Sequence, residues 1–426
     1  MGYKNTIYIV YALPGCMRQV YFVIFFVAVT AASGQNTISP YSIFGPGEIQ
    51  NQGFTTNQAM GGAGISLNSG NALNRLNPAS CTGIDSLHVI SEIGAGAKFS
   101  GLSTSSHSET GFSGSLKYLA LGFRYSGRFA GSIGVAPFSH IGYSIEKENY
   151  VEGTNAVYIA EYVGSGGINQ FYFTNAFEVA RNLSVGVNTS FMFGSLMQEE
   201  KISPTDIVPQ MQITRMDYLK SIYFDYGLQY MCRLKKLDVS FGATYSHQQK
   251  LKSKHIVTVT NESYSTVGSD EYNSDHLIIP QKFGFGIGLE NKGRYVAAFD
   301  YELQQWSGVE YPIQYNDFVN SHSFSFGIQV NPWEQRVINK SFKNWDYRFG
   351  VNYKTSYLKI GGRVIDDKSI SLGLGIPLSG NVSKMNLTFK AGIAGTTDNN
   401  LILEKYALLQ LGFSLNEFWF IRRRYD

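Results

Sequence analysis

The sequence has few cysteines, few charges and, after residue 35, no long apolar run. Three cysteines among 426 residues exclude a small scaffold held by disulfides. We treat Cys81 and Cys232 as free thiols, although an oxidising compartment would also allow them to pair. Charged residues make up only 16%, which is little for a chain that must coat a soluble surface. The formal net charge of +3 lacks the basic excess of a nucleic-acid-binding protein, so we expect no nucleic acid partner.

The N-terminus carries the three parts of a secretory signal peptide. A positive charge at Arg18 precedes an apolar run and then small residues that end at Gly34. We therefore assign 1–34 to a signal peptide and expect translation to start at Met17. A competing interpretation is a lipoprotein signal that ends at Cys16, although the nearby proline fits such a signal poorly.

From residue 87 onward the sequence repeats an alternation of apolar with small polar residues. In KSISLGLGIPLS (368–379) the isoleucines and leucines occupy one face of an extended chain, whereas serines and glycines occupy most of the other. The apolar face suits lipid and the uncharged face suits a crowded lumen, and a sheet in hydrocarbon must close on itself. We therefore predict an all-β fold in which 87–426 form a transmembrane antiparallel β-barrel. The same alternation recurs at 183–193, 239–245, 282–290, 323–330, 385–393 and 407–420.

The alternating runs number about fourteen, an even number, as a barrel with both termini on the periplasmic side requires. Tight turns such as 126–128 and 181–182 are interspersed with longer polar connections, such as 200–217 and 261–276. Short periplasmic turns and long outer loops are typical of outer-membrane barrels. The connection 332–344 departs from this rule because it is long where a short turn is expected.

Residues 35–86 precede the first strand and show no period of their own. They contain more apolar residues than a free tail would, and a barrel of about fourteen strands leaves a bore that needs a plug. We predict that they fold as a hatch inside the lumen; the alternative is a disordered periplasmic tail. Gly61, Gly62 and Gly64 are expected to allow positive φ and close backbone approach.

The segment AMGGAGISLNSGNALNRLNPAS (59–80) resembles the hatch of the long-chain fatty acid transporter (FadL/TodX-like) family of outer-membrane barrels. That family has a Gly/Ala-rich stretch followed by Asn-Pro-Ala just before strand one. Asn77, Pro78 and Ala79 occupy the matching place here. The stretch SPYSIFG (39–45) is similar to the start of the family's Bacteroidetes-type members.

A second match lies in the expected third strand, at GSIGVAPFSHIGYS (131–144). Gly134, Pro137 and Phe138 match family residues at a kink that opens the barrel wall sideways, whereas Ser139 replaces the usual glycine. The resemblance thus implies a lateral gate at these residues. Proline also lacks an N–H and removes a ladder hydrogen bond, which by itself predicts either a kink or a bulge that only shapes the wall.

The resemblance implies passive uptake of fatty-acid-like hydrophobic small molecules across the bacterial outer membrane, by hatch displacement and lateral exit at the third strand. The alternative is a non-transport barrel that serves as a docking or shuttle component of a protein secretion system. No motif points to hydrolase chemistry, so we expect no enzyme activity, cofactor or metal site. Expected partners are outer-membrane lipids, the hydrophobic small-molecule cargo and the outer-membrane assembly machinery, with the protein itself a monomer.

Overall fold

The computed structural model describes residues 39–68, 70–153, 155–203, 209–263, 265–291, 294–309, 317–331, 342–378 and 383–418. The expected signal peptide (1–34) and start at Met17 lie outside these residues. Most of the long connection 332–344 also lies outside them. Among the described residues, no helix is both long enough and apolar enough to cross a membrane.

One antiparallel sheet closes into a barrel, because the last strand pairs with the first wall strand from Leu403↔Ser103 to Phe418↔His88. The wall strands are β2 (His88–Ser103), β3 (Ser108–Arg124), β4 (Phe129–Tyr150), β5 (Val157–Ala180), β6 (Leu183–Ile202), β7 (Met211–Leu234), β8 (Leu237–Ser246), β9 (Gln249–Asn261), β10 (Thr266–Ile279), β11 (Lys282–Asn291), β12 (Tyr295–Gln304), β13 (Ser321–Val330), β14 (Asp346–Ile360), β15 (Arg363–Pro377), β16 (Lys384–Ala394) and β17 (Leu403–Phe418).

Two long strands of the wall are each interrupted by a short break, so each of them appears above as two elements: β8 with β9, and β10 with β11. Strands β8 and β9 both pair with β7, and β9 and β8 pair in turn with β10 and β11. Counting β8 with β9 and β10 with β11 as single wall strands reduces the sixteen strands β2–β17 to fourteen. The predicted fold class and strand number are therefore confirmed.

The alternation places apolar side chains outside and small polar ones inside. On β15, Ile370 and Leu372 are 56% and 54% exposed on the outer face, whereas Ser371 between them is 1% exposed. Large apolar residues cover the outer face of most other wall strands in the same way. Such a surface is stable against lipid rather than water, because burial of these side chains in lipid removes their apolar area from water.

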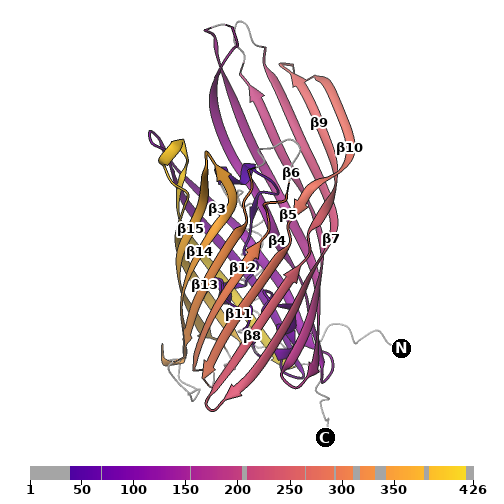
Figure 1. Cartoon of the computed structure of the whole chain (residues 1–426), viewed down its shortest axis with the longest axis vertical. Coiled ribbons are helices and arrows are strands. Elements are labelled where there is room, and N and C mark those ends of the chain that lie inside the picture. The colour runs from indigo at the N-terminus through magenta and orange to yellow at the C-terminus, as the bar shows by residue number, and fades with distance from the viewer. Residues whose placement is uncertain are drawn as a thin grey trace, which may run out of the picture.

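Polar strands extend the wall further than the sequence predicted. Residues 261–276 were expected to be a loop, but Thr266–Ile279 form strand β10, paired with β9 along most of its length. Strand β7 likewise begins at Met211, within the connection expected at 200–217. Figure 1 shows β9 and β10 on the side of the wall that rises above β13, β14 and β15. Apolar alternation is required only where a strand faces lipid, so these polar extensions lacked the pattern on which the prediction relied.

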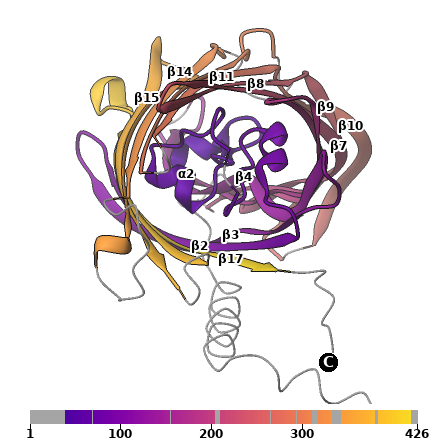
Figure 2. The same cartoon turned by 90° about the horizontal axis from the view of Figure 1, so that it is seen from below.

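The described residues before the first wall strand lie inside the barrel, as Figure 2 shows. They contain four short elements, which are η2 (Pro40–Ile43), β1 (Glu48–Ile49), α2 (Thr55–Ala59) and η3 (Pro78–Gly83). Most of the residues between 53 and 66 are buried. We call the described part of this segment, 39–86, the hatch.

Candidate functional site

Glycines of the wall allow the hatch backbone to touch the wall backbone. A Cβ on Gly350 of β14 would lie 1.9 Å from the Gly61 nitrogen, and one on Gly327 of β13 would lie 2.4 Å from the Met60 Cβ. Further along the wall, a Cβ on Gly242 of β8 would lie 2.1 Å from a hatch carbonyl oxygen. Any side chain at these positions would push the hatch away. The wall glycines that fit against the hatch in this way are Gly186, Gly227, Gly242, Gly327, Gly350 and Gly373.

The three hatch glycines named from the sequence lie at one tight turn after α2. Gly61 and Gly62 have φ of +70° and +90°, as expected. Gly64 does not have positive φ, which corrects part of the expectation; it is required instead because a Cβ would lie 2.2 Å from the Asn57 side-chain nitrogen. The turn aims its N–H groups at the wall. The backbone N–H groups of Gly64 and Ile65 donate to the Asp300 carboxylate at 2.6 and 2.8 Å.

Asn77 is the N-cap of η3, and Pro78 and Ala79 are its first two residues. The Asn77 side chain is fully buried and accepts a hydrogen bond from the Ala79 N–H at 3.0 Å. Its amide also donates to the carbonyl oxygens of Ile65, within the hatch, and of Leu228, on β7, at 2.8 and 3.0 Å. Asn77 therefore caps η3, closes the hatch on itself and ties it to the wall.

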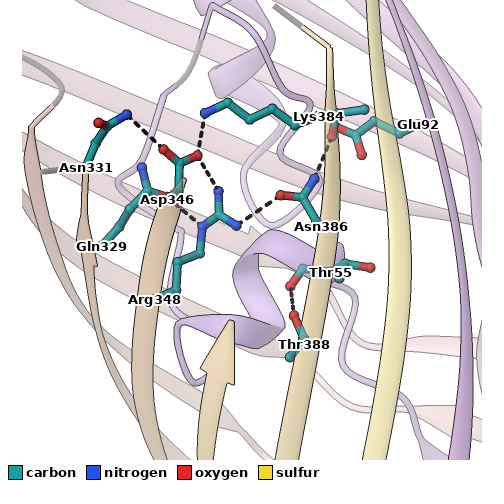
Figure 3. A network of polar contacts seen from close by, with 10 residues as sticks. Thr55, Glu92, Gln329, Asn331, Asp346, Arg348, Lys384, Asn386 and Thr388 are labelled. Carbon is teal, nitrogen blue, oxygen red and sulfur yellow. Dashed lines mark hydrogen bonds and ion pairs between the residues drawn. The ribbon is translucent and has the colours of Figure 1, made fainter. Parts of the chain in front are cut away.

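A buried polar network on the wall lies beside α2, and Figure 3 shows it. Arg348 forms an ion pair with Asp346 at 3.0 Å and donates to Asn386 at 2.9 Å. Glu92 accepts from the backbone N–H of Leu73 in the hatch at 3.2 Å. Its carboxylate also accepts from Ser414, which connects it to Asn386. A hydroxyl on β16 joins the hatch as well, since Thr388 donates to the Thr55 carbonyl oxygen at 2.9 Å.

Sequence reasoning missed the wall residues Asp300, Glu92 and Arg348. The available signal was a charged residue at an inward position, where most side chains of the alternating strands are small and uncharged. Charged side chains are rarely buried without partners, so such positions mark either a charged lumen or a contact with the hatch.

The wall separates between β3 and β4. Their pairing runs from Arg124↔Ala130 to Leu119↔Val135 and stops there. Beyond this point β3 pairs only with β2, whereas β4 continues along β5 to Tyr150. The β4–β5 register shifts between Pro137 and Ser139, which is a bulge at the predicted position in the third wall strand.

The hatch occupies the edge of β4 that β3 leaves. Strand β1 pairs with β4 through Glu48↔His140 and Ile49↔Ser139. The N–H of Gln50 donates to the Phe138 carbonyl oxygen at 2.9 Å, and the Ser39 N–H donates to the Gly142 carbonyl oxygen at 2.8 Å. The hatch therefore covers from inside the part of the wall where β3 and β4 part.

The three residues expected to form a lateral gate lie around this separation. Gly134 lies in the paired part of β4, where a Cβ would lie 2.5 Å from the Leu119 carbonyl oxygen. Pro137 lies at the bulge. Phe138 is 7% exposed and belongs to a buried apolar cluster, with its ring 6.2 Å from that of Tyr223 on β7.

Next to the separation, a cavity of about 310 Å³ lies between the hatch and the wall. One side of it carries lysines and carboxylates, including Lys98, which lies 2.8 Å from Glu404 and 3.9 Å from Glu48 of β1. The Tyr406 hydroxyl donates to Asp367 at 2.9 Å in the same region. The charged residues that line the cavity are Glu48, Arg75, Lys98, Lys117, Asp225, Lys282, Glu302, Lys354, Asp366, Asp367, Lys390 and Glu404.

Neither thiol takes part in a disulfide: Cys81 and Cys232 are both free. Burial in the hatch raises the pKa of the Cys81 thiol to about 11, so the thiol is unreactive at neutral pH while it stays buried. Among the residues that the structure describes, no group of three His, Cys, Asp or Glu side chains is placed to hold a metal ion.

Comparison with known proteins gives a family match and a set of similar folds. The model of the family described as BamG matches residues 16–426. No curated protein matches the chain. Among solved structures, the CymD monoaromatic hydrocarbon channel is similar with a TM-score of 0.57 at 18% identity, over 85% of this chain and 97% of that one.

Two toluene transporters have the same fold. The Ralstonia pickettii transporter TbuX gives a TM-score of 0.57 at 14% identity, over 86% of this chain and 98% of that one. The P. putida transporter TodX gives 0.58 at 13% identity, over 88% and 100%. At these identities the likeness establishes the fold that the sequence resemblance implied.

Proposed function

Since the chain belongs to the BamG family, which its match over 16–426 shows, we propose that it is a barrel subunit of an outer-membrane assembly machinery. In this role it acts as a non-enzymatic scaffold in the bacterial outer membrane. The assembly machinery is then a complex to which this protein belongs, and not only the machinery that inserts it into the membrane. This proposal develops the docking alternative that the sequence left open and places it in assembly rather than secretion.

The contacts between hatch and wall support a scaffold. Asp300, Glu92 and Thr388 hold the hatch from three separate wall strands, and Asn77 holds it to a fourth. The wall glycines bring the two backbones into direct contact. If the hatch were displaced during transport, all of these contacts would have to break for each molecule transported. A permanent plug keeps the barrel impermeable while other surfaces bind partners.

Passive uptake of hydrophobic small molecules is the second candidate, and the separation of β3 from β4 favours it. The separation lies beside the cavity, and Pro137 and Phe138 line the cavity as well. In this case the hatch would move away from the edge of β4, and the cargo would leave through the wall near Gly134. The many charged residues around the cavity count against an apolar cargo, because each would need to stay paired or hydrated.

An engineered disulfide that holds the hatch against the wall distinguishes the assembly role from transport. Ile49 and Ser139 are Cα partners in the β1–β4 pair, so Ile49→Cys with Ser139→Cys places two thiols at the spacing of paired strands. Cys81 and Cys232 are replaced by serine, and the reduced protein is the matched control. The chromosomal copy is depleted while locked or reduced protein is supplied from a plasmid.

We expect depletion to lower the amount of folded outer-membrane barrels, measured by their heat-dependent mobility in gels. We also expect the locked protein to restore it as well as the reduced protein does. Uptake of labelled oleate is measured in the same cells. Unchanged barrel levels on depletion would refute the assembly role. Loss of oleate uptake only in the locked protein would establish transport instead.

A further inference from the structure

The outer wall over β14–β17, β2 and β3 contains a hollow of about 1020 Å³ that faces away from the lumen. The bulky side chains at its border, Phe99, Phe112, Ile370 and Ile393, are all at least 49% exposed. Its floor is formed by two small outward residues, Ala391 and Ala407. We call this hollow the outer groove.

Strand register explains why the groove exists. Ile370, Ala391, Ala407, Phe99 and Phe112 are successive partners across β15, β16, β17, β2 and β3, so they form one row on the outer face. Two alanines in the middle of a row of bulky residues leave a depression about two strands wide, roughly 10 Å. The rings of Phe99 and Phe112 contact each other at 4.8 Å and form one wall of it.

The row two residues above carries positive charge. Lys368, Ile393 and Lys405 are successive partners there, so the two lysines lie on either side of β16 at the upper rim of the groove. Tyr353 is the next partner in this row, and the Lys368 Nζ lies 5.7 Å from its ring centroid. A tyrosine together with lysines above an apolar band is typical of the interface between hydrocarbon and headgroups.

The two lysines differ in how they are paired. Lys368 lies 2.8 Å from Asp366, and its side chain is 68% exposed. Lys405 is exposed, and no described residue forms an ion pair with it within 4.0 Å. At the edge of hydrocarbon a lysine ammonium is costly unless it reaches an anion or water. The groove therefore combines a dry apolar floor with cations at the headgroup level.

We propose that the outer groove binds an anionic glycolipid of the outer leaflet, of the lipid A type. One acyl chain lies on Ala391 and Ala407, and phosphate lies between Lys368 and Lys405. The proposal rests on the placement in the outer membrane made above, but not on the assembly role. A zwitterionic phospholipid could fill the floor but would offer the two lysines no net charge. The groove thus selects the lipid by charge and holds it by shape.

Native mass spectrometry of the full chain in detergent tests this. The protein is mixed with equal amounts of lipid A and phosphatidylethanolamine. We expect wild type to retain one lipid A and little phosphatidylethanolamine. Ala391→Phe with Ala407→Phe fills the floor and should abolish retention. Lys368→Gln and Lys405→Gln should each weaken it about five-fold, the equivalent of ~1 kcal/mol for one lysine near an anionic lipid.

Matched controls carry the same changes elsewhere on the outer face. Ala297→Phe adds a ring on β12, and Lys250→Gln with Lys252→Gln removes two exposed lysines on β9; these should keep wild-type retention. Heat-dependent mobility in gels confirms that each variant is folded. Equal retention by the groove variants and the controls would overturn the proposal, as would equal retention of both lipids by wild type. A co-purifying protein lost only in the groove variants would make the groove a protein interface and would also overturn it.

Discussion

Removal of the Asn77 side chain should loosen the hatch while the barrel stays closed. Asn77 is fully buried and makes three hydrogen bonds, to Ile65, Ala79 and Leu228. A typical hydrogen bond contributes about 1 kcal/mol net, so Asn77→Ala should lower the free energy of local opening by about 3 kcal/mol. That difference corresponds to an increase of about 100-fold in the open population. The wall loses only one of its contacts and keeps its ladder.

The hatch carries its own probe for this opening. Cys81 follows Asn77 within η3 and is 4% exposed, so a maleimide reaches it only when η3 leaves the wall. With Cys232 replaced by serine, the rate of Cys81 labelling measures the open population. We expect the rate to rise about 100-fold in Asn77→Ala, and heat-dependent mobility in gels to remain as in wild type.

Asn175→Ala is the control for this experiment. Asn175 accepts a hydrogen bond from Tyr125 on the exposed face and lies away from the hatch, so labelling should not change. An unchanged Cys81 rate in a folded Asn77→Ala barrel would show that this side chain does not hold the hatch. Loss of the folded barrel itself would show that the hatch is part of the folding unit rather than a separate plug. Either result would refute the reasoning.

Three further predictions use the same protein. Gly350→Val should displace the hatch or block assembly, since a Cβ there lies 1.9 Å from the Gly61 nitrogen. Gly101→Ala is the control, because the nearest neighbour of its Cβ lies at 3.8 Å, and it should leave the rate of Cys81 labelling unchanged. Equal labelling rates in the two variants would contradict the backbone contact. Phe138→Ala should lower the free energy of unfolding by about 3–5 kcal/mol in denaturant titrations; a change below about 1 kcal/mol would mean that the ring is not packed. Labelling of Cys81 should rise about tenfold per pH unit through pH 10, because burial raises the pKa of this thiol to about 11 and the thiolate is the reactive form; a plateau near pH 9 would show an ordinary, accessible thiol.

Much of the fold could be predicted from local pattern. Side chains alternate across a strand, so the order Ile370, Ser371, Leu372 already states which face meets lipid and which meets the lumen. The closed barrel follows because hydrocarbon cannot satisfy the edges of an open sheet. The same reasoning failed for β10 (266–279). A strand above the lipid carries no apolar face, so its sequence pattern predicted a loop.

The hatch was predictable as a segment but its contacts were not. Its glycines and Asn77 stood out because a backbone without ladder partners needs unusual φ and side-chain hydrogen bonds. The wall partners Asp300, Glu92 and Gly350 showed no local signal that would tie them to it. Asp300 and Gly350 lie more than 200 residues from the hatch in sequence, and although an inward charge marks Asp300 and Glu92 as unusual, it does not say which hatch atoms they bind.

The sequence by itself determined the class of fold, the number of wall strands and the presence of either a kink or a bulge near Pro137, because these depend on period and on residues that lack an N–H. Only the tertiary structure decided that β3 leaves β4 at Val135, that β1 takes its place, and that Lys368 and Lys405 flank one groove. These are facts of register between strands. Register is set by closure of the whole barrel, and a one-residue shift of any strand would exchange the inner and outer neighbours of every residue on it.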